Sequence, residues 1–171
     1  MNHHEQVVDL LEKHFKGADI VGLEIGCWRA DLTKTILLRC PNARLFTVDP
    51  WKFREGNGFE GGHPQEWQDL SKAHAFGCLD VYRDRVKVLE MESDLAFEGL
   101  LGSGMKFDFS WIDGDHTTAV VSRDIANSKK IVKKGGIVGG HDFATITPAL
   151  LENFPNEEIH EGVDQTWWVF I

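Results

Sequence analysis

The strongest constraint on the fold is the segment 107–143, in which two strand-like runs each end in a cluster of acidic and histidine side chains. The runs cover residues 107–112 and 136–140, and a helix-length segment lies between them. The residues that follow the two runs are Asp113, Asp115 and His116, and then His141 and Asp142. This pattern predicts a βαβ unit, and open α/β sheets bind ligands at the carboxyl ends of their strands. We therefore expect a functional site at this edge.

The same alternation of strand and helix patterns extends over most of the chain. The predicted strands cover residues 20–25, 45–48, 86–89, 107–112 and 136–140, and the predicted helices cover residues 5–15, 29–39, 64–83, 95–101, 117–132 and 147–154. Alternating β and α elements are typical of a parallel sheet with helices on both faces and right-handed crossovers. The spacing in the third of these helices places Trp67, Leu70, His74 and Gly77 along one side.

The C-terminal tail breaks this alternation. Residues 158–160 and 166–171 have strand character, and a turn near Gly162 joins them, which indicates an antiparallel hairpin. The predicted fold is therefore α/β: a Rossmann-like, doubly wound and mostly parallel sheet with a C-terminal antiparallel hairpin.

Length and glycine content suggest how the chain is organised. A chain of 171 residues fits one domain, which we assign to 1–171, with a leading helix within 1–17. Residues 51–63 contain four glycines and are expected to form a loop placed to cover a ligand. Among the histidines outside the two clusters, only His63, at the end of this loop, is expected to reach the site.

The net charge excludes some partners. The chain carries 27 acidic and 18 basic residues, for a formal charge of −9, whereas nucleic-acid binders usually have a basic face. No apolar run reaches membrane-spanning length and no signal peptide is evident, so neither nucleic acid nor a membrane is an expected partner. Three widely spaced cysteines indicate neither a disulfide framework nor a structural zinc site. We expect a cytoplasmic protein that acts on a small-molecule substrate.

The first strand and the turn after it suggest a cofactor site. Gly26 forms a tight turn after the strand, which lets backbone amides approach a ligand closely, and the acid Glu24 lies two residues before this glycine. The GxGxxG spacing of dinucleotide sites is missing, which disfavours an NAD-dependent oxidoreductase. Asp49, at the end of the second strand, stands where a carboxylate can accept hydrogen bonds from ribose hydroxyls.

Several ordered motifs resemble those of the class I S-adenosylmethionine-dependent methyltransferases (SAM-dependent methyltransferases). They are Glu24-Ile25-Gly26, Asp49 with Trp51, Ser93, Ile112-Asp113-Gly114-Asp115-His116, Gly135-Gly136-Ile137-Val138-Gly139-Gly140-His141-Asp142 and Trp167-Trp168-Val169. The fourth and fifth resemble the IDGxH and GGxxxGHD motifs of a small family within this class. Ala30 departs from the pattern, because the class often has a second glycine there.

The resemblance implies S-adenosylmethionine as the cofactor and assigns residues to its parts. Glu24 and Gly26 would border the methionine part, Asp49 would hold the ribose, and Glu92 or Ser93 would lie beside the adenine. Asp113 would border the cofactor from the fourth strand. Trp51 is open to two interpretations, adenine stacking and packing within the loop.

The Asp113 to Asp142 region resembles the acceptor edge of catechol-type O-methyltransferases. A lysine base follows the metal-binding aspartate by three residues in that family, and His116 has this spacing from Asp113. His116, Asp113 and Asp142 are therefore the predicted catalytic residues. The sequence leaves open whether this region also binds a divalent metal ion. Asp113 and Asp142 would coordinate a Mg²⁺-like ion, and a softer ion could also be coordinated by His141 or His116. The competing interpretation is that these acids only cap helices.

Methyl transfer to the oxygen or nitrogen of a small acceptor is the predicted function, with or without a divalent metal. The alternatives are a protein that binds S-adenosylmethionine without methyltransferase activity and, less favoured, an NAD-dependent oxidoreductase. The sequence leaves open the oligomeric state, including a homodimer whose partner subunit completes the pocket.

Overall fold

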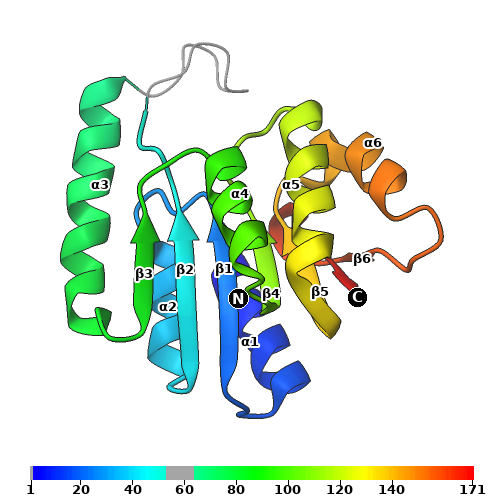
Figure 1. Cartoon of the computed structure of the whole chain (residues 1–171), viewed down its shortest axis with the longest axis horizontal. Helices are drawn as coiled ribbons and strands as arrows, with labels where there is room; N and C mark the ends of the chain where they lie inside the picture. The colour runs from blue at the N-terminus through cyan, green and yellow to red at the C-terminus, as the bar shows by residue number, and fades with distance from the viewer. Residues whose placement is uncertain (1, 53–63) are drawn as a thin grey trace.

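A computed structural model of the chain describes residues 2–52 and 64–171 and contains a seven-stranded sheet in the order β3-β2-β1-β4-β5-β7-β6 (Figure 1). The strands are β1 (Ile20–Ile25), β2 (Ala43–Val48), β3 (Val86–Leu89), β4 (Phe107–Ile112), β5 (Val132–Gly140), β6 (His160–Glu161) and β7 (Trp167–Phe170). Strands β1 to β5 are parallel, whereas β7 is antiparallel to both β5 and β6. The mostly parallel sheet with a C-terminal hairpin is confirmed.

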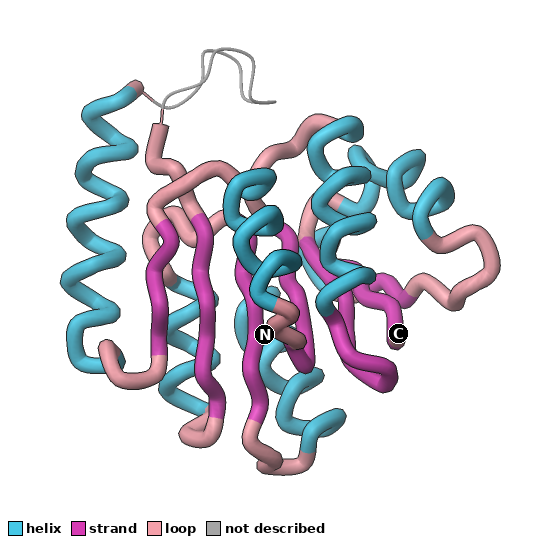
Figure 2. Tube along the Cα trace, in the orientation of Figure 1, coloured by secondary structure: helices cyan, strands magenta, loops and turns pink. Residues whose placement is uncertain are grey.

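Helices cover both faces of this sheet (Figure 2). They are α1 (His3–Phe15), α2 (Asp31–Arg39), α3 (Gln65–Leu79), α4 (Ser93–Ser103), α5 (Thr118–Ile131) and α6 (Phe143–Asn153), with short 3₁₀ turns η1 (Asp80–Tyr82) and η2 (Val163–Gln165). One hydrophobic cluster packs α1, α2 and α3 on one face, and a second packs α4, α5 and α6 on the other. None of the helices in the described ranges has the length and apolar character needed to cross a bilayer.

The leading helix α1 has a clear start and an apolar side. Asn2 Oδ1 accepts a hydrogen bond from the Glu5 amide at 2.9 Å, and the Glu5 carboxylate accepts one from the Asn2 amide at 3.2 Å. This reciprocal capping box fixes the first turn, which contains His3. Val7 and Val8, 1% and 0% exposed, anchor the helix in the core.

The predicted side of α3 was wrong. Trp67 and Leu70 are 57% and 70% exposed, whereas Ser71, Ala75 and Leu79 are buried. The residues that α3 buries next to the sheet are mostly small, so helical spacing of the larger apolar residues did not identify the contact side. Most of the predicted loop at 51–63 lies outside the described residues, and its covering role stays a prediction.

Several element boundaries also differ from the predictions; α6, for example, begins at Phe143 rather than at residue 147. The fifth strand begins at Val132, four residues earlier than expected, and Val132 therefore belongs to β5 rather than to the buried side of α5. Val132 pairs with Phe107, and the register shifts before Phe109. Gly135, with φ +82°, permits the irregular backbone that no helical or strand periodicity predicts.

The observed orientation of α3 can be tested by substitution. Leu70→Lys is expected to change the free energy of unfolding by no more than about 0.5 kcal/mol, as is usual for an exposed position. Ala75, 0% exposed, has no room for a larger side chain, so Ala75→Leu should cost about 1–3 kcal/mol. Urea denaturation of the two variants measures both effects, and the reverse ranking would restore the predicted side.

Candidate active site

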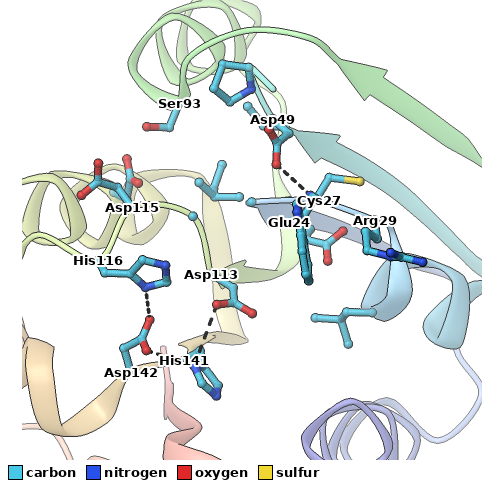
Figure 3. A pocket seen from close by; sticks show the side chains of 18 of the residues that line it. Glu24, Cys27, Arg29, Asp49, Ser93, Asp113, Asp115, His116, His141 and Asp142 are labelled. Atoms are coloured by element: carbon cyan, nitrogen blue, oxygen red, sulfur yellow. Dashed lines mark hydrogen bonds and ion pairs between the residues drawn. The ribbon is translucent and has the colours of Figure 1, made fainter. Parts of the chain in front are cut away.

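A cavity of about 410 Å³ opens at the carboxyl ends of the parallel strands (Figure 3). The predicted site residues that line it are Glu24, Gly26, Asp49, Glu92, Ser93, Asp113, His116, His141 and Asp142. They come from the ends of β1 to β5 and meet there because parallel strands all point to one edge. The volume lies within the usual range for small-molecule sites, about 300–1,000 Å³.

Trp51 is the predicted site residue that does not line this cavity. Its side chain is 2% exposed within the core around α1, α2 and α3, and its indole Nε1 donates a hydrogen bond to the Trp28 carbonyl at 2.8 Å. Of the two interpretations that the sequence leaves open for Trp51, this burial corresponds to packing rather than to adenine stacking.

The turn after β1 requires glycine at position 26. Gly26 has φ +91°, and a Cβ atom there would lie 2.1 Å from the carbonyl oxygen of Asp113. The β1 turn and the end of β4 are therefore in direct backbone contact, which brings the cofactor candidates next to the acid cluster. Trp28 and Ala30 also adopt positive φ, 44° and 63°, so the turn stays sharp with alanine in place of the second glycine.

Asp49 organises two loops at the cavity wall. One carboxylate oxygen accepts a hydrogen bond from the Trp28 amide at 2.7 Å, and the other accepts one from the Trp51 amide at 2.7 Å. The fixed carboxylate is suited to receive hydroxyl donors.

Glu24 is buried at the base of the cavity, where it is 2% exposed. Thr33 Oγ1 and Thr47 Oγ1 both donate hydrogen bonds to one of its carboxylate oxygens, the latter at 2.9 Å. Burial raises the pKa of Glu24 to about 8, although the two threonine hydrogen bonds oppose this shift. Sequence reasoning identified Glu24 but not its threonine partners, which lie on α2 and β2.

The raised pKa of Glu24 predicts a pH dependence of the free energy of unfolding. The folded protein retains a proton on Glu24 up to about pH 8, whereas the unfolded chain releases it near 4.5, so the free energy of unfolding falls as pH rises between these values. The contribution is at most about 1.4 kcal/mol per pH unit. Glu24→Gln should flatten the pH dependence measured by urea denaturation across this window. An unchanged slope would contradict the buried, protonated state.

At the acceptor edge, Asp142 holds two histidines. His116 Nδ1 is hydrogen-bonded to one Asp142 oxygen, and His141 Nδ1 lies 3.2 Å from the other (Figure 3). His141 Nδ1 is also 4.0 Å from an Asp113 oxygen. Asp142 has φ 62°, an unfavourable conformation for a residue other than glycine, and it presents its carboxylate between the two rings.

The charges at this edge support one another. Hydrogen bonding to Asp142 raises the pKa values of His116 and His141. Burial alone would raise the pKa of Asp142, but the hydrogen bonds from the two histidines outweigh it and hold that pKa well below its usual range. Burial raises the pKa of Asp113 to about 6, an effect that the nearby His141 opposes. Asp142 is therefore the permanently ionised member.

Asp113, His141 and Asp142 place one ligand atom each within 4.8 Å of one another, so they could hold a metal ion. Two carboxylates and an imidazole suit several divalent ions. Asp115 accepts a hydrogen bond from the Thr117 amide at 2.7 Å just before α5.

Sequence reasoning missed several residues of the cavity wall, among them His3, His4 and Asp124. His3 and His4 on α1 line the cavity, although His63, outside the described residues, was the only additional histidine expected there. Asp124 on α5 also lines it, at 1% exposure, and burial raises its pKa to about 7. An acid beside Val121 and Ile125 on an apolar helix side was a usable signal for Asp124.

Solved structures with a similar fold include methyltransferases. CalS11, a calicheamicin methyltransferase, aligns with a TM-score of 0.68 at 13% identity over 99% of this chain and 80% of its own. The N-methyltransferase NodS from Bradyrhizobium japonicum WM9 aligns with a TM-score of 0.62 at 15% identity. This alignment covers 97% of the present chain and 91% of NodS. SMU.776, assigned as a methyltransferase and crystallised with S-adenosylhomocysteine (SAH), aligns with a TM-score of 0.66 at 10% identity. This alignment covers 97% of the present chain and 48% of SMU.776, so the present chain spans about half the length of that protein. The fold is that of the class I SAM-dependent methyltransferases.

The sequence itself gives the more specific assignment. Residues 23–143 match the methyltransferase-domain family, and the chain belongs to that family. This match contains both the Gly26 turn and the Asp113 to Asp142 cluster. A search of curated proteins gave no match. The narrower subgroup suggested by the IDGxH and GGxxxGHD motifs stays a prediction.

Proposed function

We propose that this protein transfers a methyl group from S-adenosylmethionine to an oxygen or nitrogen atom of a small molecule. The main support is the joint placement of the Gly26 turn and the His116–Asp142 pair in one cavity. The formal charge of −9 makes a nucleic-acid acceptor unfavourable. We also propose that the protein acts in the cytoplasm.

The residues of the cavity fit the cofactor. The Gly26 turn and Glu24 line the cavity where we place the methionine part of the cofactor, and the Asp49 carboxylate suits the ribose hydroxyls. Glu92 and Ser93 line the same cavity after β3, and we place the adenine beside them. When bound, the cofactor supplies an electrophilic methyl group on a sulfonium.

His116 is the proposed general base. Its Nδ1 faces Asp142, so proton exchange with the acceptor would use Nε2. His116 would accept the proton that the acceptor atom loses when it is methylated. Asp142 stabilises the imidazolium that results, and the cavity aligns donor and acceptor.

Asp113 and Asp142 are the proposed ligands of a divalent ion such as Mg²⁺, with His141 as a third ligand for a softer ion. Support comes from the low pKa of Asp142 and from the short distances within the group. An ion there would lower the pKa of an acceptor hydroxyl and orient it. EDTA treatment followed by Mg²⁺ addition tests this role: full methyl transfer in EDTA would favour metal-free base catalysis.

Calorimetry and turnover separate the candidate functions. We expect S-adenosylmethionine and SAH to bind in one-to-one stoichiometry and NADH not to bind. A panel of hydroxylated aromatics, sugars and amines, assayed with and without Mg²⁺, would then identify the acceptor class. Cofactor binding without turnover would favour a binding protein, and binding of NADH alone would overturn the proposal.

A further inference from the structure

A second group of ligand atoms lies at the mouth of the cavity, next to the proposed acceptor site. It consists of His3 at the start of α1, His141 after β5 and Asp164 in η2. His3 Nδ1 is 2.6 Å and His141 Nε2 is 3.9 Å from the same Asp164 oxygen. We infer that these three residues bind a transition-metal ion of the Zn²⁺ type. This inference goes beyond methyl transfer and does not depend on it.

His141 is oriented as a metal ligand. Its Nδ1 lies 3.2 Å from an Asp142 oxygen, so the tautomer with a proton on Nδ1 donates to that carboxylate. The lone pair then lies on Nε2, which is buried and has no hydrogen-bond partner among residues 2–52 and 64–171. Metal-binding histidines commonly donate their other ring N–H to a carboxylate in this way. An ion near Asp164 would satisfy this buried acceptor.

The distances and the ligand types indicate the class of ion. Tetrahedral zinc with bonds of about 2.0–2.2 Å places its ligand atoms about 3.3 Å apart. The observed 2.6 and 3.9 Å lie on either side of this value, so small side-chain rotations of His3 and Asp164 would complete the site. Two imidazoles and one carboxylate favour Zn²⁺, Co²⁺ or Ni²⁺ over Mg²⁺ or Ca²⁺. Three protein ligands leave a fourth position for water or another small ligand.

The backbone around Asp164 is held in a form that presents its carboxylate to α1. Asp164 and Gln165 have φ values of 53° and 60°, which are costly for residues other than glycine. Gln6 Oε1 accepts hydrogen bonds from the Val163 amide and from Thr166 Oγ1, both at 2.8 Å. These bonds join α1 to η2 independently of His3, so the two elements are already aligned for a shared ion.

The two candidate metal groups use opposite nitrogens of His141. Asp113 and Asp142 face Nδ1, whereas Asp164 and His3 face Nε2. Binding at His3 and Asp164 therefore leaves the two carboxylates of the proposed Mg²⁺ site in place. An ion bound by His3, His141 and Asp164 would link α1 and η2 to the end of β5, beside the cavity.

Metal titration of the protein without a histidine tag tests the site. We expect one equivalent of Co²⁺ to give the intense visible absorption of a four-coordinate ion, and Zn²⁺ to displace it. His3→Gln and Asp164→Asn should each weaken Zn²⁺ binding at least tenfold by calorimetry. Their side chains are 24% and 63% exposed, so both variants should fold, which circular dichroism can check.

Two control variants define the site. His74→Gln removes a competing pair on α3, where His74 Nε2 lies 3.3 Å from Cys78 Sγ, and it should leave tight binding intact. Asp113→Asn should also leave it intact. Absence of tight binding, equal binding in the His3 and Asp164 variants, or loss of binding in Asp113→Asn would each overturn the inference. S-adenosylmethionine affinity and turnover, measured separately, test the proposed function alone.

Discussion

His116→Gln is expected to lower kcat for methyl transfer by about 10²–10⁴-fold while leaving S-adenosylmethionine affinity nearly unchanged. The reason is that His116 Nε2 is the proposed proton acceptor, whereas Glu24 and Asp49 lie on the cofactor side of the cavity. Steady-state kinetics with an acceptor found in the panel, together with calorimetry, measures both quantities. The control is His160→Gln, because His160 stacks on Trp168 away from the cavity wall and should change neither.

The pH dependence of kcat distinguishes a base role of His116 from a purely structural one, because only a base role makes kcat follow the protonation of this residue. Hydrogen bonding to Asp142 raises the pKa of His116 above its ordinary 6.5, so kcat should rise with pH through that higher value. Asp142→Asn removes the carboxylate, and the rising part of the profile should move to lower pH. A His116→Gln variant that keeps most of its activity would contradict the base role and favour activation of the acceptor by a metal.

Much of the fold and of the site could be predicted because both depend on short-range patterns. Buried strands are continuous apolar runs, and their order with intervening helices predicts a parallel sheet. The polar residues at the carboxyl ends of β1, β2, β4 and β5 must then meet at one edge. This is why Glu24, Asp49, Asp113 and Asp142 were predicted as site residues and why all four line the same cavity.

The remaining features depend on contacts that no local pattern encodes. His3 and Asp164 are 161 positions apart, and they meet only because α1 packs beside the C-terminal turn η2. The side that α3 buries carries the small residues Ser71 and Ala75, so the spacing of the larger apolar residues pointed to the wrong side. Periodicity identifies which side of an element is apolar, but not which neighbour it meets.

Gly26→Ala should produce the largest loss of cofactor binding, more than about 100-fold in Kd. Glycine alone fits here, because the residue has φ +91° and a Cβ would lie 2.1 Å from the Asp113 carbonyl oxygen, which is backbone and cannot rotate away. Relief of this clash must move the β1 turn away from β4, and that movement separates Glu24 and Asp49 from Asp113. A loss of about 1–3 kcal/mol in the free energy of unfolding should accompany it.

Gly114→Ala is the matched control, since Gly114 lies directly across from this turn. The contact nearest to a Cβ at position 114 is a side-chain atom of Ile25 at 3.4 Å, and its φ is not in the left-handed range. Its folding stability should therefore stay within about 0.5 kcal/mol of the natural protein. Calorimetry with SAH and urea denaturation of both variants measure the difference. If Gly26→Ala bound SAH normally, contact between the β1 turn and β4 would not be required for the cofactor site, and the assignment of Gly26 to it would be wrong.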